Sequence, residues 1–397
     1  MQIFESDEKL IQEINDSDDD EEYEEDENED GDEEKTEQNY EEEPDVENLE
    51  KEDKVSEEDT ATKPAEKRKS VTFLEESVVL TKIEARKGLN TIGKTFDGLS
   101  YAYINLDVVK RRLTDVSVIK NMRWVLHINV SDNRLTSQAL GALSSMTALS
   151  LKADKNRVSS LQFPLANYLK ILSLNFNEIE STEGLEGPHL AHLHLDNNKL
   201  KSLTLHSSSL PKLRCLTAAN NMIQNISQLQ VPTLRELYLG GNQIKRLENL
   251  STFKELRVLH LRKNRIKKLK DFSHESLKLN YLNLRSNKIE NINEMKKLSN
   301  LKFLRSLVVK DNLFDTSTSD TELNDETLNM NRIEILARIP LLTKLDKHMV
   351  SKEERLEALE VRKNLGEDEE EEEESDVEDK IEEEQEDHDE VEEEEDE

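Results

Sequence analysis

Cysteine is nearly absent from this sequence, which has a single one, Cys215, among 397 residues. One thiol cannot form an internal disulfide framework, so we expect the chain to work in a reducing, intracellular compartment. Long apolar runs are also absent, and no stretch approaches the ~18 consecutive apolar residues that a membrane span needs. The N-terminus, MQIFESDEKL, is acidic and does not resemble a secretory signal. These absences together predict a soluble protein that does not enter a membrane.

The motifs that carry enzyme chemistry are absent as well. The sequence has no glycine-rich phosphate loop, no HExxH motif, no paired-cysteine motif and no visible nucleophile–base arrangement. His192, His194 and Asp196 alternate along one expected strand and so share a face, which is an arrangement that can hold a metal. Such clusters also arise from ordinary surface composition, and we interpret this one as solvated surface. We expect no enzymatic activity, cofactor, metal or small-molecule substrate.

Charge is distributed very unevenly along the chain, whose formal net charge is −34. Residues 1–70 carry 32 acidic and 8 basic side chains, and residues 367–397 carry 24 acidic and 1 basic. Residues 71–366 hold the remaining 32 acidic and 45 basic side chains, a net charge of +13. Because both ends lack the apolar residues that offset the entropy of ordering, we expect them to be disordered acidic tails. They are expected to hold basic partners, to fold back onto the basic middle, or to act only as solubilising spacers.

One pattern repeats through the middle of the sequence. LRELYLGGNQI (234–244) and LRVLHLRKNRI (256–266) both follow LxxLxLxxNx(I/L), and nine copies of this pattern lie between residues 125 and 314. Its ninth position is always asparagine: Asn133, Asn156, Asn177, Asn198, Asn221, Asn242, Asn264, Asn287 and Asn312. Their spacing of 21 to 25 residues is typical of leucine-rich repeats. The predicted fold class is therefore α/β, a leucine-rich-repeat solenoid with a curved parallel sheet and short 3₁₀ or helical turns on its convex side.

The flanks of the repeats predict end caps, which a solenoid needs to cover its open ends. We expect a disordered tail over 1–70, a helix and a capping strand over 71–124, the nine repeats over 125–332, a cap and a helix over 333–366, and a second tail over 367–397. Alternation around Tyr101 and Tyr103 indicates the capping strand. At the other end, Leu336, Ile339, Leu342 and Leu345 are expected to close the core, and Ser351 with Glu354 forms a capping box for a last helix.

Positions 4 and 6 of each repeat are expected to point into the core, and positions 3, 5 and 7 outward on the concave side. The asparagine amide at position 9 is expected to bond turn backbone that stacking hides from water. We expect Cys215, at position 3, to be exposed. The C-terminal half of the concave side is aromatic and basic, and its candidate protein-binding residues are Tyr238, His260, Arg262, Tyr281, Arg285 and Lys310. An acidic protein surface is one partner that this mixture would suit, nucleic acid is another that we do not expect, and scattered solvent charge is the alternative to both.

A second candidate site lies before the repeats. Lys69-Ser-Val71-Thr-Phe73 matches the (R/K)-x-(V/I)-x-F docking pattern of protein phosphatase 1 ligands, which bind by strand addition with two side chains in pockets. Ser70 follows three basic residues and is a candidate phosphorylation site whose phosphate would disturb the motif. Short motifs of this kind also match by chance, and the alternative is that Val71 and Phe73 begin the expected N-terminal helix.

The flanks carry a more specific resemblance than the repeats do. GLNTIGKTFDGLSYAYINLDVVKRRLTDV (88–116), NEIESTEGLEGPHLAHLHLDNNKL and IPLLTKLDKHMVSKEERLEALEVRKNL (339–365) resemble the leucine-rich repeat-containing protein 23 family. The resemblance implies a non-enzymatic scaffold of the third radial spoke, with radial spoke head and axonemal proteins as partners. It also implies the cytoplasm, cytoskeleton and ciliary or flagellar axoneme as location, and a role in sperm motility. An acidic-tailed nuclear protein that binds histones and a protein phosphatase 1 regulatory subunit are the alternatives.

Overall fold

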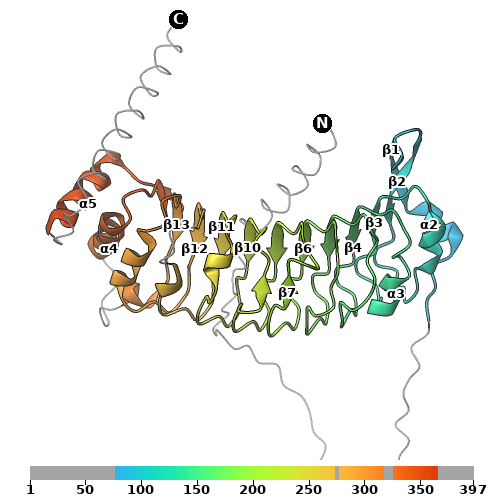
Figure 1. Cartoon of the computed structure of the whole chain (residues 1–397), viewed down its shortest axis with the longest axis horizontal. Coiled ribbons are helices and arrows are strands. Elements are labelled where there is room, and N and C mark those ends of the chain that lie inside the picture. Colours follow the sequence, from blue (N-terminus) through green and yellow to red (C-terminus); the bar gives the residue numbers. More distant parts are fainter. Residues whose placement is uncertain (1–76, 273–276, 317–324, 365–397) are drawn as a thin grey trace, which may run out of the picture. The chain divides into compact units, whose positions relative to one another are not determined.

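In the computed structural model, which describes residues 77–272, 277–316 and 325–364, one long sheet runs through the repeats (Figure 1). Each of the nine repeats contributes one short strand, which confirms the predicted fold class. In spatial order the strands are β1 (Leu89–Lys94), β2 (Tyr101–Asp107), β3 (His127–Asn129), β4 (Ser150–Lys152), β5 (Ile171–Ser173), β6 (His192–His194), β8 (Cys215–Thr217), β10 (Glu236–Tyr238), β11 (Val258–His260), β12 (Tyr281–Asn283), β13 (Ser306–Val308), β14 (Lys344–Leu345) and β15 (His348–Met349). Neighbours from β2 to β14 are parallel, and β1–β2 and β14–β15 are antiparallel.

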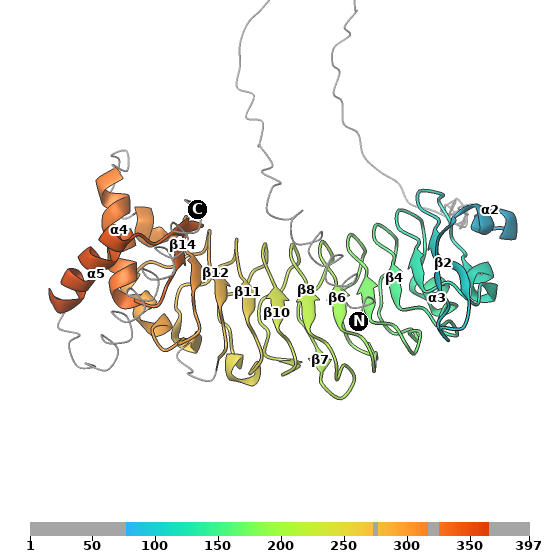
Figure 2. The same ribbon diagram turned by 90° about the horizontal axis from the view of Figure 1, so that it is seen from above.

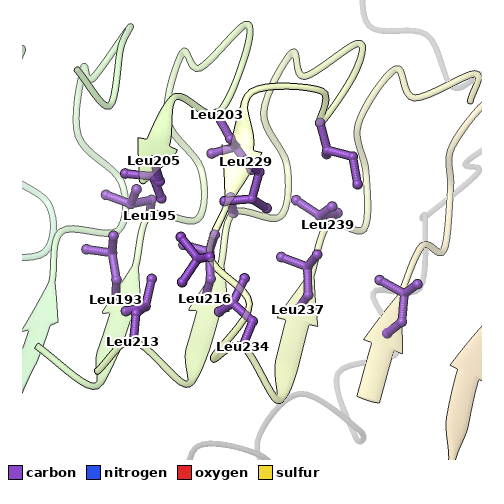
Figure 3. Packing of buried hydrophobic residues seen from close by; sticks show 14 of the residues in the cluster. Leu193, Leu195, Leu203, Leu205, Leu213, Leu216, Leu229, Leu234, Leu237 and Leu239 are labelled. Atoms are coloured by element: carbon purple, nitrogen blue, oxygen red, sulfur yellow. The ribbon is translucent and has the colours of Figure 1, made fainter. Parts of the chain in front are cut away.

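The core is built from the leucines at positions 4 and 6, as the repeat pattern predicts. Leu193, Leu216 and Leu237 lie in register on three neighbouring strands and are fully buried, and Figure 3 shows them in one row. Ala153 and Ala218, the two small residues at position 6, are fully buried as well. Each buried leucine contributes roughly 1.5–3 kcal/mol to folding, so stacking supplies a core that one repeat could not form alone.

A left-handed backbone position precedes the asparagine of every repeat. In all nine repeats the residue at position 8 has a positive φ: Asp132, Lys155, Phe176, Asn197, Asn220, Gly241, Lys263, Ser286 and Asp311. This turn bends the chain away from the strand and brings the position-9 side chain into the stack. Gly241 differs from the others because a Cβ there would lie 2.1 Å from Oδ1 of Asn220.

The nine asparagines form a hydrogen-bonded ladder between repeats, which confirms and extends the predicted role of position 9. Oδ1 of Asn242 accepts from the backbone N–H of Ile223 in the preceding repeat at 3.0 Å. Its Nδ2 donates to the carbonyl oxygens of Ala218, also in the preceding repeat, and of Leu239 and Gly240. The same bonds to preceding backbone N–H groups recur at the other eight asparagines. Each repeat is therefore held to its neighbour by a buried polar contact as well as by leucine packing.

The return side of the repeats is short and mostly irregular, as expected from the ten residues available to each connection. It contains the 3₁₀ helices η2 (Leu250–Thr252), η3 (Lys270–Phe272), η4 (Ile292–Leu298) and η5 (Leu313–Thr316), the short helix α3 (Ser137–Gly141) and a separate two-stranded parallel sheet of β7 (Leu205–His206) and β9 (Leu229–Gln230). The two-stranded sheet is not signalled in the sequence.

The N-terminal cap is a helix followed by a hairpin. The helix α2 (Lys82–Lys87) starts at Thr81, which forms a capping box with Glu84. The expected helix is thus present, but its apolar residue Ile83 is exposed and Ala85 is the side chain that it buries. β2 is the predicted capping strand and pairs with β3 of the first repeat, with η1 (Ser117–Asn121) between them in sequence. β1, which was not predicted, pairs with the outer side of β2.

Two helices lie beside β14 at the C-terminal end of the sheet (Figures 1 and 2). The four predicted cap residues, Leu336, Ile339, Leu342 and Leu345, are all buried. The helix α4 (Asp325–Arg338) begins within the stretch that we assigned to the repeats, so the cap helix crosses the boundary set at 332 and 333. The helix α5 (Lys352–Asn364) starts with the predicted capping box of Ser351 and Glu354. Leu356 is 62% exposed, and Ala358 is the side chain of α5 that is buried.

Within the described ranges, no helix has the length and hydropathy that crossing a membrane requires. Both acidic tails fall outside these ranges, as do Lys69, Ser70, Val71 and Phe73.

Candidate protein-interaction face

The outward side chains of the nine repeat strands form one continuous surface, which we call the strand face. Positions 3 and 5 are the outward residues of each strand, and position 7 is the second residue after the strand. Because neighbouring parallel strands are about 4.8 Å apart and in register, residues at the same position form rows across the sheet. The strand face therefore consists of three rows of side chains, whose content differs between the N-terminal and C-terminal repeats.

Three of the predicted binding residues form a stack of rings. The ring centroids of Tyr238 and His260 are 4.6 Å apart with an interplanar angle of 25°. The rings of His260 and Tyr281 are 4.8 Å apart at the same angle. Tyr238 and His260 are partners in register, whereas Tyr281 pairs with Val258 and reaches His260 diagonally. Offset ring pairs of this kind add about 0.5–1.5 kcal/mol each beyond area burial, so the stack is preorganised before any partner arrives.

The other three predicted residues occupy position 7 in the last three repeats, beside the stack. Arg262 and Lys310 are exposed. Nε of Arg285 contacts Oδ2 of Asp311 at 2.7 Å, in an ion pair whose side chains are 37% and 40% exposed. An exposed pair of this kind contributes little, at most about 1 kcal/mol, so Arg285 can exchange Asp311 for another carboxylate. All six predicted residues thus lie on one half of the strand face, which we call the basic half.

The second and the fourth repeat carry an aspartate at position 7, and each of these aspartates accepts hydrogen bonds from the next repeat. Asp196 accepts from Oγ1 of Thr217 and from the backbone N–H of Ala219, each at 2.6 Å. Asp154 accepts from Oγ of Ser173 at 2.6 Å and from the N–H of Asn175 at 2.7 Å. Burial raises the pKa of Asp154 although both hydrogen bonds oppose the shift. These carboxylates therefore stabilise the contact between neighbouring repeats.

His192, His194 and Asp196 do not converge on one point. His194 is buried, and its Nδ1 lies 3.3 Å from Oγ1 of Thr217, whose hydroxyl proton goes to Asp196. Burial first, and then the neighbouring charges of His192 and Lys152, lower the pKa of His194 to about 4. Among the residues that the structure describes, no group of three histidine, cysteine or acidic side chains is placed to hold a metal ion.

The expected exposure of Cys215 was wrong. Its side chain is buried, and the burial raises the pKa of the thiol well above its usual value. Cys215 sits on β8 between β6 and β10, where its partners in register are His192 and Glu236. A short side chain at position 3 is covered when both neighbours are longer, and the pattern of one repeat cannot reveal this.

The N-terminal end carries aromatic residues that the sequence analysis did not identify as a site. The rings of Phe96 and Tyr168 are 4.8 Å apart, and that of His189 follows at 6.0 Å from Tyr168. On the hairpin of β1 and β2, Tyr101 and Tyr103 are exposed. Phe96 is 72 residues from Tyr168 in sequence, so only the folded chain brings these rings together.

The chain matches the family model described as Leucine Rich repeats (2 copies) over residues 232–274, which include the sixth and seventh repeats. With the parallel sheet, the leucine core and the asparagine ladder, this match defines a leucine-rich-repeat protein. The sequence of this chain is 35% identical to that of leucine-rich repeat-containing protein 23 of Homo sapiens over 293 residues, which are 73% of this chain and 82% of the human protein. The protein of that name from Bos taurus is 36% identical over 72% of this chain and 80% of its own length. The chain belongs to the leucine-rich repeat-containing protein 23 family.

A less similar relative comes from a different group. A protein phosphatase 1 regulatory inhibitor subunit homolog of Arabidopsis thaliana is 31% identical over 173 residues, which are 42% of this chain and 53% of that protein. Repeats of this type form protein-interaction scaffolds, which are typically non-enzymatic. The fold and the family together make this chain a protein-interaction scaffold.

Proposed function

We propose that this chain is a structural component of the axonemal radial spoke, at the head of the third spoke, and that it serves ciliary and flagellar beating, including sperm motility. Family membership carries the proposal. The match to the human relative spans 293 residues, whereas the nine repeats span 190, so the similarity extends into the caps. Generic leucine-rich repeats resemble one another only within the repeats. The similarity of the caps therefore supports a shared function more strongly than the repeats do.

The basic half of the strand face is the proposed contact with a radial spoke head protein. Stacked aromatic rings next to arginines are the composition found at energetic centres of protein interfaces. The ring stack and the asparagine ladder hold these side chains in place, which reduces the entropy lost when a partner binds. Charge at Arg262, Arg285 and Lys310 selects a partner surface that is acidic.

Charge reversal tests this contact. We expect the double variant Arg262→Glu, Arg285→Glu to lose most of the radial spoke head proteins that co-purify with the intact chain from axonemes. The matched control is Lys201→Glu, Lys212→Glu, which makes the same charge change at exposed residues outside the strand face. Equal co-purification with both variants would exclude the basic half as the contact. An imaging experiment addresses the location: we expect axonemal staining in ciliated cells, whereas nuclear staining would favour the histone-binding alternative.

Regulation or targeting of protein phosphatase 1 is a second candidate function, favoured by the relative from Arabidopsis thaliana and by the Lys69-x-Val71-x-Phe73 motif. The variant Val71→Ala, Phe73→Ala removes both side chains that fill pockets in this binding mode. If phosphatase 1 is a partner, this variant loses the phosphatase from pull-downs and keeps the radial spoke proteins. If no phosphatase is captured by the unaltered chain, this candidate is wrong.

A further inference from the structure

The strand face reverses its charge along the solenoid. At position 7 the second and fourth repeats carry Asp154 and Asp196, and the last three carry Arg262, Arg285 and Lys310. The carboxylates of Asp154 and Asp196 accept hydrogen bonds from the following repeat. The side chains of Arg262 and Lys310, by contrast, are exposed to solvent. Lys263, at the left-handed position next to Arg262, is exposed as well. The two halves therefore differ at position 7, where only the basic half carries exposed charged side chains.

The basic half has the chemistry to bind carboxylates. The stack covers both faces of the His260 ring and one face each of the Tyr238 and Tyr281 rings, and all three side chains are half-buried, so ring edges contribute to the surface that a ligand would meet. The edge of an aromatic ring carries partial positive charge, so it favours an anion in the same way as the neighbouring guanidinium groups do. A run of glutamates is the peptide that matches a row of ring edges beside a row of cations, since each residue supplies one carboxylate and little bulk.

The chain itself contains such a peptide. Residues 367–397 hold 24 acidic side chains and one lysine, and this segment follows α5, which ends at Asn364. We propose that residues 367–397 bind in cis to the basic half of the strand face and occupy it in the absence of a partner. This proposal rests on the proposed function because both assign a ligand to the basic half of the strand face.

The length of the segment allows this contact. In the sheet, β10 is five strands away from β15, a distance of roughly 24 Å at the usual strand spacing. The 13 residues of α5 add at most about 20 Å. The 33 residues after Asn364 can span up to roughly 110 Å when extended, which exceeds the required distance more than twofold. Tethering also gives the segment a millimolar effective concentration, so weak charge contacts suffice for occupancy.

Occupancy in cis would make the basic half selective. A partner has to displace a segment with 24 carboxylates, which only a surface with better placed acidic groups or an added apolar contact can do. Nonspecific polyanions would be excluded by the same competition. The face would open as salt rises, because the Debye length falls from about 10 Å at 0.1 M to about 3 Å at 1 M.

Zero-length carbodiimide cross-linking of the purified full chain tests this inference, because it joins carboxylates to lysine amines only when they touch. We expect monomeric cross-links from residues 367–397 to Lys263 and Lys310 at 50 mM salt, with a yield about tenfold higher than at 1 M. Lys201 and Lys212, exposed elsewhere, are the reference lysines. The variant Arg262→Glu, Arg285→Glu keeps Lys263 and Lys310 and should lower their cross-link yield about tenfold, since it reverses two cations at the centre of the site. The variant Lys201→Glu, Lys212→Glu should leave the yield unchanged.

Three results would overturn the inference: equal cross-linking of Lys201 and Lys212, cross-links found only in dimers, or a yield that the arginine variant does not change. Circular dichroism of both variants shows whether either has lost its fold, and cross-linking of the unaltered chain decides the matter in any case. No radial spoke protein takes part in this assay. A failure of the proposed axonemal function would therefore leave its outcome untouched, and the reverse also holds.

Discussion

Replacing Asn242 with alanine removes one rung of the asparagine ladder in the middle of the solenoid. Asn242 is 6% exposed and makes four hydrogen bonds to backbone groups. The three carbonyl oxygens that it serves keep other donors: Nδ2 of Asn221, Nδ2 of Asn264 and the N–H of Asn220. The backbone N–H of Ile223 differs from these carbonyls, because it donates to Oδ1 of Asn242 and the substitution removes that acceptor. The main cost of the substitution therefore falls on one buried amide.

The magnitude follows from these contacts. A buried N–H left without an acceptor costs about 1–3 kcal/mol, and each of the three other bonds contributes about 0.5–1.5 kcal/mol net. Because the carbonyls remain bonded, the lower part of the second range applies. We expect Asn242→Ala to lower the free energy of unfolding by about 2.5–4.5 kcal/mol.

Urea unfolding followed by circular dichroism measures this loss. Asn167→Ala is the matched control, since Asn167 is exposed, and it should change the unfolding free energy by less than about 0.5 kcal/mol. Hydrogen exchange adds a local measurement: the amide of Ile223 should exchange faster in Asn242→Ala, and more so than amides two repeats away. A loss below about 1 kcal/mol, or protection of Ile223 that is unchanged, would refute the role assigned to the ladder.

Three further predictions concern the core and the buried titratable groups. Leu237→Ala should cost about 2–5 kcal/mol in urea unfolding, because Leu237 is fully buried, whereas Leu356→Ala should cost less than about 0.5 kcal/mol. His194 has its pKa lowered from 6.5 to about 4, so the unfolded chain binds this proton more readily and stability falls as the pH drops from 6.5 toward 4. Between pH 7 and pH 4.5 the unfolding free energy should lose about 2.4 kcal/mol through His194, and this loss should be absent in His194→Gln. An equal pH dependence in both proteins would contradict this assignment. Cys215 should resist a thiol reagent in the native protein and react fully after denaturation, and a native rate close to the denatured rate would mean that the thiol is accessible.

The sequence was sufficient for features that repeat. Leucines at positions 4 and 6 and asparagine at position 9 recur at fixed spacing, and their burial and bonding depend only on a neighbour of the same pattern. The cap residues Leu336 and Leu345 were predictable for a related reason, since an open end of a leucine core has to be covered. Family resemblance in the flanks was likewise visible without the structure.

Features that depend on a particular neighbour were not predictable. The exposure of Cys215 was predicted wrongly because it is decided by β6 and β10, on repeats before and after its own. β1 has no strong alternation of its own and is a strand because β2 offers it a pairing edge. Leu356 is exposed because α5 packs through the small side chain of Ala358, a choice that helical spacing alone leaves open.

The candidate site lies between these two cases. Position in the repeat was enough to put Tyr238, His260 and Arg262 on one surface, and the ring stack confirms that the aromatic residues meet. The diagonal contact from Tyr281 and the ion pair between Arg285 and Asp311 depend on rotamers, and so they required the folded chain.

Cross-linking mass spectrometry on isolated axonemes tests the central claim most directly, because it identifies partners and contact surfaces together. Our account predicts that this chain is present in the axoneme and that Lys263 and Lys310, on the basic half of the strand face, cross-link to acidic peptides of radial spoke head proteins. Absence of the chain from axonemes, or cross-links to spoke proteins only from lysines such as Lys201 and Lys212, would contradict it.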